Sequence, residues 1–255
     1  MVISIVVIFI ILFLYMLFLA FQINVKEHSI QIKEMLDGEQ FHLFFISDIH
    51  RRKIDDKLIH SIIGKVDIVI IGGDLTEKGV PLERTEHNIK QLKKLGKVYY
   101  VYGNNDREVN EQRLQSIFDK HSVRMLVNES VDLNFRSSLI RLVGINDGFS
   151  GNVKIYEAFQ EVKDTDILVF VSHAPAYFHH AKKLSKPHLL LAGHLHGGQI
   201  RLGPFGMYEN GTFKINENSA ELVSNGFGTT GVPLRLGAKS ECHIITMHGT
   251  SIDQR

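Results

Sequence analysis

Five short apolar segments, each followed within three residues by polar side chains and three of them by glycine, constrain the fold of this chain more than any other feature. The segments cover residues 41–46, 68–71, 98–102, 167–171 and 189–191. Patterns typical of helices lie between several of them, and this alternation is typical of an α/β domain with a largely buried sheet. Open α/β sheets place their ligands at the carboxyl ends of the strands. We therefore expect the polar residues after the five segments to share one site.

These polar residues include seven side chains that can bind a metal ion, namely Asp48, His50, Asp74, Asn104, His173, His194 and His196. This set is too large for one tetrahedral ion. Two ions that share a bridging carboxylate would use all of it and leave a position for water and substrate. Cys242 is the single cysteine, which excludes a thiolate cluster. The mixture of carboxylate, amide and imidazole favours Mn, Fe or Zn over Ca, without choosing among the three.

The helical patterns have recognisable beginnings. Asp55 or Asp56 is suited to cap a first helix, Pro81 opens a second, and Asn110 opens a third. Near the end of the chain, residues 243–247 have the apolar composition of a strand.

Residues 2–21 form an apolar run in which only Ser4 and Tyr15 carry polar groups and no residue is charged. A helix of this length, at about 1.5 Å per residue, is roughly 30 Å long and matches the hydrocarbon core of a bilayer. A cleaved signal peptide is the alternative. However, no Lys or Arg precedes the run, and residues 18–21 lack the small residues of a cleavage site. We expect a retained transmembrane anchor.

Lys26 and Lys33 follow the run, so the positive-inside rule places the large domain on the cytoplasmic side of the cell membrane. We predict an anchor over residues 1–22, a juxtamembrane segment and the start of the domain over 23–40, and a single domain over 41–255. The chain has 29 Lys plus Arg against 28 Asp plus Glu, a balance that argues against nucleic acid as a partner. The sequence does not indicate an oligomeric state.

The ordered motifs resemble those of the calcineurin-like metallophosphoesterase superfamily. They are Asp48-x-His50, Gly73-Asp74, Gly103-Asn104, His173 and Gly193-His194-x-His196. The match spans residues 41–199, and residues 197–201 with 225–235 resemble more narrowly its membrane-associated bacterial branch. The resemblance implies two mixed β-sheets packed as a sandwich and flanked by helices, a four-layer α/β fold, here preceded by one transmembrane helix.

The resemblance also implies how the metal ligands are shared. One ion would be held by Asp48, His50 and His196, the other by Asn104, His173 and His194, and Asp74 would bridge the two.

We therefore expect a membrane-anchored, metal-dependent phosphoesterase of the phosphodiesterase or pyrophosphatase type. It would cleave phosphoester or phosphoanhydride bonds with a metal-activated hydroxide and two divalent ions, Mn, Fe or Zn. Membrane contact through residues 2–21 favours a lipid-linked substrate, and soluble nucleotides or other phosphorylated small molecules are the alternative. A metal-binding scaffold or protein-interaction module on the same fold, with weak or no catalysis, is the alternative function.

The third motif departs from the family pattern, which has Gly-Asn-His where this chain has Asn105 at the His position. The resemblance implies that this imidazole protonates the leaving oxygen or stabilises the charge of the transition state. The amide of Asn105 can donate a hydrogen bond but cannot supply a proton. Asn105 and Asp106 are the candidate catalytic residues, and Asp106 is also suited to orient a ligand histidine. We expect a substrate with a good leaving group, or a substitute acid among Asp106, Arg107, His179 and His180.

Arg51 and Arg52 directly follow the first two candidate ligands. A guanidinium group can pair with a phosphate through two parallel hydrogen bonds, so both are candidate substrate-binding residues. A solvated turn is the alternative for each.

Overall fold

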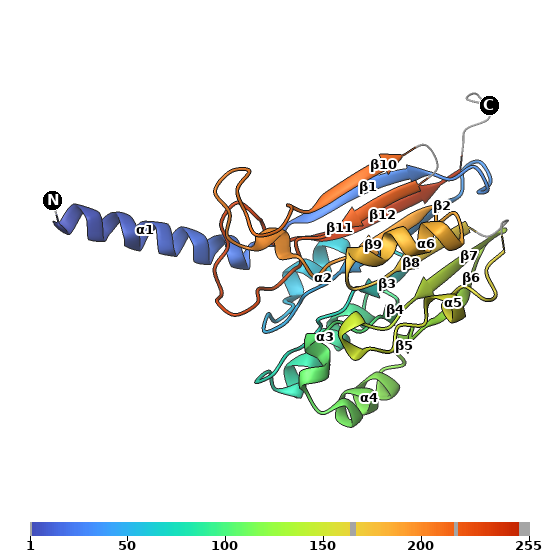
Figure 1. Cartoon of the computed structure of the whole chain (residues 1–255), viewed down its shortest axis with the longest axis horizontal. Coiled ribbons are helices and arrows are strands. Elements are labelled where there is room, and N and C mark those ends of the chain that lie inside the picture. The colour runs from blue at the N-terminus through green and yellow to red at the C-terminus, as the bar shows by residue number, and fades with distance from the viewer. Residues whose placement is uncertain (1, 164–166, 217–218, 250–255) are drawn as a thin grey trace.

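The computed structural model describes residues 2–163, 167–216 and 219–249, and these residues form two mixed β-sheets that pack face to face. Helices cover the outer face of each sheet, and one apolar helix extends from the body (Figure 1). The predicted fold class is therefore confirmed.

Each sheet has six strands. The first has the order β1 (Val25–Gln31), β12 (Cys242–His248), β2 (Gln40–Ile46), β3 (Ile68–Ile71), β4 (Lys97–Tyr100) and β5 (Arg124–Met125). The second has the order β10 (Thr212–Asn216), β11 (Ser219–Val223), β9 (Leu189–Ala192), β8 (Ile167–Val171), β7 (Ser138–Gly144) and β6 (Glu129–Phe135). Strands β2, β3 and β4 run parallel in one sheet, and β8 and β9 run parallel in the other.

Helices α2 (Asp56–Ile62), α3 (Leu82–Lys93) and α4 (Glu111–Lys120) pack on the first sheet, and α5 (Ile155–Ala158) and α6 (Phe178–Leu184) pack on the second. Short 3₁₀ turns complete the loops: η1 (Asn105–Glu108), η2 (Gly148–Ser150), η3 (Pro175–Tyr177) and η4 (His196–Gly198). The helix starts agree with the sequence. Asp55 caps α2 by accepting the N–H of Lys57 at 2.8 Å, and Asn110 caps α4.

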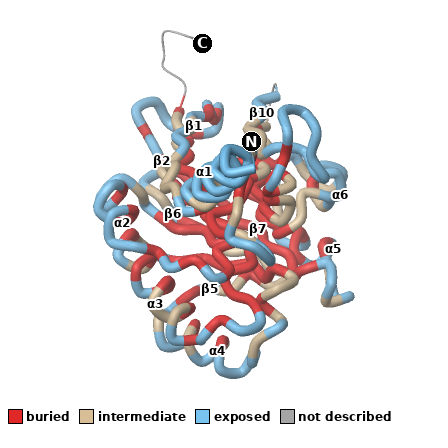
Figure 2. The backbone as a smooth tube through the Cα atoms, turned by 90° about the vertical axis from the view of Figure 1, so that its left-hand side faces the viewer, coloured by how far each residue is buried: buried red, intermediate tan, exposed pale blue. Residues whose placement is uncertain are grey.

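The central strands are apolar on both faces because both faces are buried. In β2, Leu43 and Phe45 point into the core between the sheets, whereas Phe44 and Ile46 point toward the helices. Successive side chains of a strand alternate between its faces, so a strand buried on both sides reads as a continuous apolar run. Figure 2 shows the buried backbone concentrated in this interior.

Helix α1 (Val2–Phe21) is exposed along most of its length and is long and apolar enough to cross a membrane, by length and composition. Its last turn enters the body, where Leu19 and Ala20 are buried. The guanidinium of Arg52 donates to the carbonyl oxygens of Ala20 at 3.3 Å, Phe21 at 2.7 Å and Gln22 at 2.9 Å. The last carbonyls of a helix have no partner within it, so Arg52 caps α1 from the loop after β2.

Glu39 joins the two sheets at the end away from the candidate ligands. Its carboxylate accepts from the Ser137 N–H at 3.1 Å and from the hydroxyls of Ser137 and Ser138, in the turn between β6 and β7. These hydrogen bonds, led by the two hydroxyls, lower the pKa of Glu39 to about 2. A carboxyl group whose pKa is lower in the folded state stabilises the fold at pH values above its unfolded-state pKa. This stabilisation is lost as the pH falls toward the folded-state pKa.

We expect Glu39→Gln to lower the free energy of unfolding by roughly 1–2 kcal/mol at neutral pH, because charge-assisted hydrogen bonds become neutral ones. The difference from the native chain should shrink between about pH 4.5 and pH 2, where the native carboxylate becomes protonated. Thermal unfolding of both full-length proteins in detergent across this range measures it. A difference that does not depend on pH would contradict the assignment.

Candidate metal centre

The candidate ligands meet where parallel strands of the two sheets end. Asp48 and His50 follow β2, and Asp74 follows β3 in the same sheet; His173 follows β8, and His194 follows β9 in the other sheet. Neighbouring loops are joined by backbone hydrogen bonds, such as Asp48 N–H to the Gly73 carbonyl at 2.9 Å and Gly193 N–H to the His173 carbonyl at 3.0 Å.

The ligand atoms form two clusters, each held within 4.8 Å. The first contains Asp48, His50 and His196, and the second contains Asp74, His173 and His194. In the first, the Nε2 atoms of His50 and His196 lie 3.1 Å apart. In the second, His173 Nε2 lies 3.1 Å from His194 Nδ1. Pairs of ring nitrogens that face each other at this distance suit a shared cation, which accepts both lone pairs.

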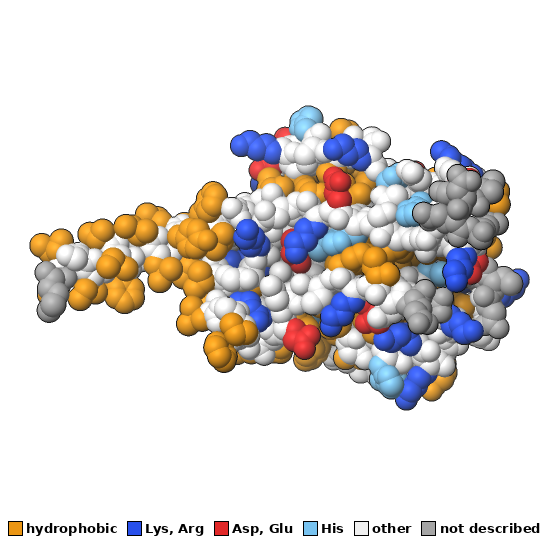
Figure 3. Space-filling view, turned by 90° about the horizontal axis from the view of Figure 1, so that it is seen from above, with side chains coloured by type: hydrophobic (Ala, Val, Ile, Leu, Met, Phe, Trp, Pro, Cys, Tyr) orange, Lys and Arg blue, Asp and Glu red, His pale blue; other side chains and the backbone are white. Residues whose placement is uncertain are grey.

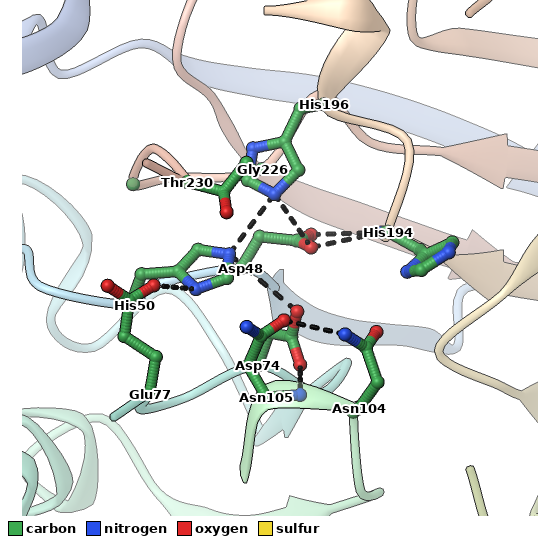
Figure 4. A network of polar contacts seen from close by, with 12 residues as sticks. Asp48, His50, Asp74, Glu77, Asn104, Asn105, His194, His196, Gly226 and Thr230 are labelled. Atoms are coloured by element: carbon green, nitrogen blue, oxygen red, sulfur yellow. Dashed lines mark hydrogen bonds and ion pairs between the residues drawn. The ribbon is translucent and has the colours of Figure 1, made fainter. Parts of the chain in front are cut away.

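Asp74 belongs to the second cluster and also faces the first. Its Oδ2 atom is 3.4 Å from Nε2 of His173. The same atom is 3.7 Å from Nε2 of His50, and Figure 4 shows these two residues. Its Oδ1 atom accepts the backbone N–H of Asn105 at 2.8 Å, which fixes the orientation of the carboxylate. One carboxylate oxygen therefore faces both groups of imidazoles.

Most of these residues have a left-handed backbone conformation. The φ angles are 53° at Asp48, 50° at His50, 51° at Asp74, 75° at His194 and 51° at His196. Non-glycine residues rarely adopt this conformation, which costs of order 1 kcal/mol or more each, and such strain concentrates at functional sites. Five strained residues that all point donors into one space indicate that the loops are shaped for the site.

Asn104 provides a test of whether the donors fit a metal. Its Nδ2 donates to Oδ1 of Asn105 at 2.7 Å, so the side-chain orientation is set. Its Oδ1 is buried and has no hydrogen-bond partner within the described parts of the chain. A buried acceptor without a partner is costly, and a cation beside it would remove that cost. The residues present therefore fit the predicted role of Asn104 as an oxygen ligand.

Electrostatics favour an ionised Asp48, neutral rings at His194 and His196, and a protonated ring at His173 before a cation binds. Burial opposes ionisation of Asp48, but the surrounding histidines, chiefly His196, lower its pKa well below the ordinary value. Burial also opposes protonation of His173, but Asp74 outweighs this and raises its pKa to about 10. Burial lowers the pKa values of His194 and His196. A bound divalent cation would take the place of the proton on His173.

Three further groups support the ligands, namely the side chains of Glu77 and Arg235 and the carbonyl of Gly72, and the sequence did not predict these roles. Glu77 is buried, and its Oε2 lies 2.9 Å from Nδ1 of His50, which turns Nε2 of that ring toward the site. Nδ1 of His173 lies 2.9 Å from the carbonyl oxygen of Gly72, which has the same effect. Arg235 is fully buried and donates to the carbonyl oxygens of Asn225 at 2.6 Å and His196 at 3.4 Å. No spacing rule identifies such contacts between distant loops.

The remaining predicted site residues have different surroundings. Asp106 is fully buried and accepts the N–H groups of Thr76 at 2.9 Å and Gly103 at 2.9 Å, so it fastens the loops that carry Asp74 and Asn104. Arg51 is exposed and paired with Glu77.

The structure brings the guanidinium of Arg52 to the end of α1 and over the ring of Phe227 at 3.7 Å, so all its described contacts are internal. Arg107 contacts Asn146 at 2.5 Å, and His179 and His180 are exposed on α6.

Comparison with known proteins gives a consistent family match. The family described as calcineurin-like phosphoesterase matches residues 41–198. The chain is 42% identical to the Bacillus subtilis protein YpbG over 228 residues, which cover 89% of this chain and 88% of the relative.

It is also 24% identical to a zebrafish "transmembrane protein with metallophosphoesterase domain", with 83% of this chain and 53% of that protein covered. A 5'-nucleotidase precursor from Thermus thermophilus shares the fold with a TM-score of 0.51 and 12% identity. That alignment covers 82% of this chain and about half of the nucleotidase, 55%.

We expect Glu77→Gln to weaken Mn²⁺ binding about 10- to 100-fold, because the ring of His50 loses a charged partner that orients it. Competition with a chelator measures the affinity. Glu83→Gln, a change at an exposed carboxylate of α3, is the matched control and should bind as the native chain does. Equal affinity of Glu77→Gln and Glu83→Gln would contradict the role of Glu77.

Proposed function

Because this chain belongs to the calcineurin-like phosphoesterase family and is a metal-dependent phosphoesterase, we propose that it uses two divalent cations, Mn, Fe or Zn, at a membrane surface. The observation that carries the proposal of two cations is the position of Asp74, whose Oδ2 faces His50 at 3.7 Å and His173 at 3.4 Å. Asp48, His50 and His196 would hold one cation, Asn104, His173 and His194 the other, and Asp74 would contact both.

When bound, the two cations supply Lewis acidity that polarises the phosphoryl oxygens and lowers the pKa of a water. The side chains and backbone of the protein hold the ligands in place. The Asn105 N–H and Glu77 fix Asp74 and His50, respectively, and Asp106 holds the loops around them. In this proposal the side-chain amide of Asn105 donates a hydrogen bond to the leaving oxygen, but an amide cannot give that oxygen a proton. The expected substrates are therefore phosphoanhydrides and activated phosphodiesters, whose leaving groups depart without being protonated.

We further propose that α1 is a retained membrane anchor. Its length and composition support this, and so does the zebrafish relative that is named as a transmembrane protein. The contacts of Arg52 with Phe21 and Gln22 also support it, because cleavage near this point would separate carbonyls from a buried guanidinium. Lys26 and Lys33 favour a cytoplasmic domain. Lipid-linked phosphates and nucleotides are the proposed substrate classes.

The central test uses the full-length chain in detergent, stripped of metal and reloaded with Mn²⁺. We expect about two ions per chain and hydrolysis of bis-p-nitrophenyl phosphate. Asp74→Ala and His194→Ala should bind less metal and lose roughly 100-fold or more in kcat. His60→Ala, at an exposed position of α2, is the control and should behave as the native chain. Two bound ions without turnover would instead support the scaffold function.

A series of leaving groups tests the role of Asn105. We expect the native enzyme to turn over aryl esters and anhydrides much faster than alkyl esters. Asn105→His should raise the rate on alkyl esters about 10- to 100-fold and change the aryl rate little, because only a poor leaving group needs a general acid. Native turnover of alkyl esters that equals that of aryl esters would contradict this assignment.

A further inference from the structure

We propose that two loops beside α1 enter the same bilayer as the helix and contact lipid through their apolar side chains. The loops are residues 199–210 and 228–236, and we refer to them together as the collar. This inference rests on the proposed anchoring of α1. The proposed binding partner of the collar is the phospholipid bilayer that α1 crosses.

The collar presents large apolar side chains to solvent. Leu202 is 72% exposed, Phe205 79%, Met207 81% and Val232 52%. Figure 3 shows apolar side chains gathered around the point where α1 meets the body, continuous with the apolar surface of the helix. Residues 202–208 and 229–234 contain no charged residue. An uncharged apolar surface that adjoins a membrane helix is suited to lipid, since apolar patches of this kind mark interaction sites.

A buried arginine folds the first loop into a fixed shape. Arg201 donates to the carbonyl oxygens of Gly197 at 3.0 Å, Pro204 at 3.0 Å and Tyr208 at 2.5 Å. Leu202 and Phe205 also exchange backbone hydrogen bonds of 2.9 and 3.1 Å. Because the backbone carbonyls of the loop bind Arg201, the side chains of Leu202, Phe205 and Met207 point outward. These apolar side chains are therefore exposed on a folded turn.

The two loops are joined to each other and to α1. The side-chain Nε2 of Gln199 donates to the carbonyls of Thr230 at 3.1 Å and Val232 at 3.0 Å. The Oε1 atom of the same side chain accepts the N–H of Thr230 at 2.9 Å. The backbone N–H of Arg235 donates to the carbonyl of Met16 in α1 at 3.1 Å. The collar is therefore held beside the helix, as Figure 1 also shows.

The position of this contact along α1 sets the depth of the collar. Met16 precedes Phe21 by five residues, or about 7–8 Å along the helix axis. The described helix needs nearly all of its length to cross a hydrocarbon core of roughly 30 Å. When α1 spans the bilayer, the segment near Met16 therefore lies at or below the level of the lipid headgroups. The collar beside it must contact lipid at that depth.

The collar also borders the candidate metal centre. The backbone N–H of Gly228, at the start of the second loop, donates to the carbonyl oxygen of Asp48 at 2.7 Å, and Val232 follows Gly228 by four residues. Figure 4 includes Thr230 of this loop in the close-up of the site. Arg235 donates to the His196 carbonyl at 3.4 Å. A bilayer that covers Val232 would bring phosphate groups of membrane lipids to the edge of the site. The geometry thus favours amphiphilic phosphate substrates over nucleotides free in solution.

The absence of tryptophan from the native sequence gives a direct test. We would place single tryptophans in the full-length chain with Phe205→Trp and, separately, Leu202→Trp. Each protein is reconstituted into phosphatidylcholine vesicles whose acyl chains carry bromine, which quenches nearby indoles. We expect blue-shifted emission and quenching by about half or more at both positions. Phe13→Trp in α1 is the positive control, and Tyr156→Trp, at an exposed position of α5, is the aqueous control.

Each outcome decides between the proposals. Quenching of Phe13→Trp without quenching of Phe205→Trp and Leu202→Trp would overturn the collar proposal and leave the anchor standing. No quenching at Phe13→Trp would overturn the anchor itself, whereas turnover of bis-p-nitrophenyl phosphate reports separately on the hydrolase. Collar indoles shielded from both bromolipid and aqueous iodide would indicate that another protein surface, such as a second copy, covers the collar, and would also overturn the proposal.

Discussion

Parallel strands that end at a common edge are the constraint on which the rest of the molecule depends. Because β2, β3 and β4 end beside one another in one sheet, and β8 and β9 in the other, five loops deliver donors to one space. The loops then bind one another through backbone hydrogen bonds and buried carboxylates, of which Asp106 is the clearest case. The two-sided apolar core holds the strands, and the strained loop residues are stable because that core fixes their ends.

The parts of the fold that were predictable from sequence are those buried on both sides. The segments at 68–71 and 167–171 coincide with β3 and β8. The segments at 41–46 and 189–191 differ from β2 and β9 by one residue at one end, and the segment at 98–102 differs from β4 by one residue at its start and two at its end. Strands β1 and β10 lie at sheet edges, where half-exposed side chains leave only a weak apolar pattern, and the sequence did not reveal them. Burial on both faces made β2, β3, β4, β8 and β9 visible as continuous apolar runs. Strand β7 is also an interior, largely buried strand, but the buried polar residues Ser138 and Arg141 interrupt its apolar run, and it was not predicted.

The candidate ligands were predictable for a related reason. Each one follows a buried strand within a few residues, so local sequence carries the signal, and the structure gathers the carboxylates and imidazoles into two clusters. Glu77 and Arg235 act through loops that are distant in sequence, and nothing near them indicates their partners. Arg52 shows the same difficulty. Adjacent to ligands, it has the chemistry of a phosphate-binding residue, but the folded chain directs it to a helix end.

That use of Arg52 has a practical consequence for biochemistry on this protein. Trimming the chain after Phe21 to obtain a water-soluble enzyme would remove two carbonyl acceptors from a guanidinium that is 8% exposed and only two residues from His50. The stranded cation would then seek water or new acceptors, and the loop that carries the first two ligands would shift with it. A slow trimmed fragment would thus reflect local damage at the site, so the catalytic rates of the whole chain and the trimmed chain are not directly comparable.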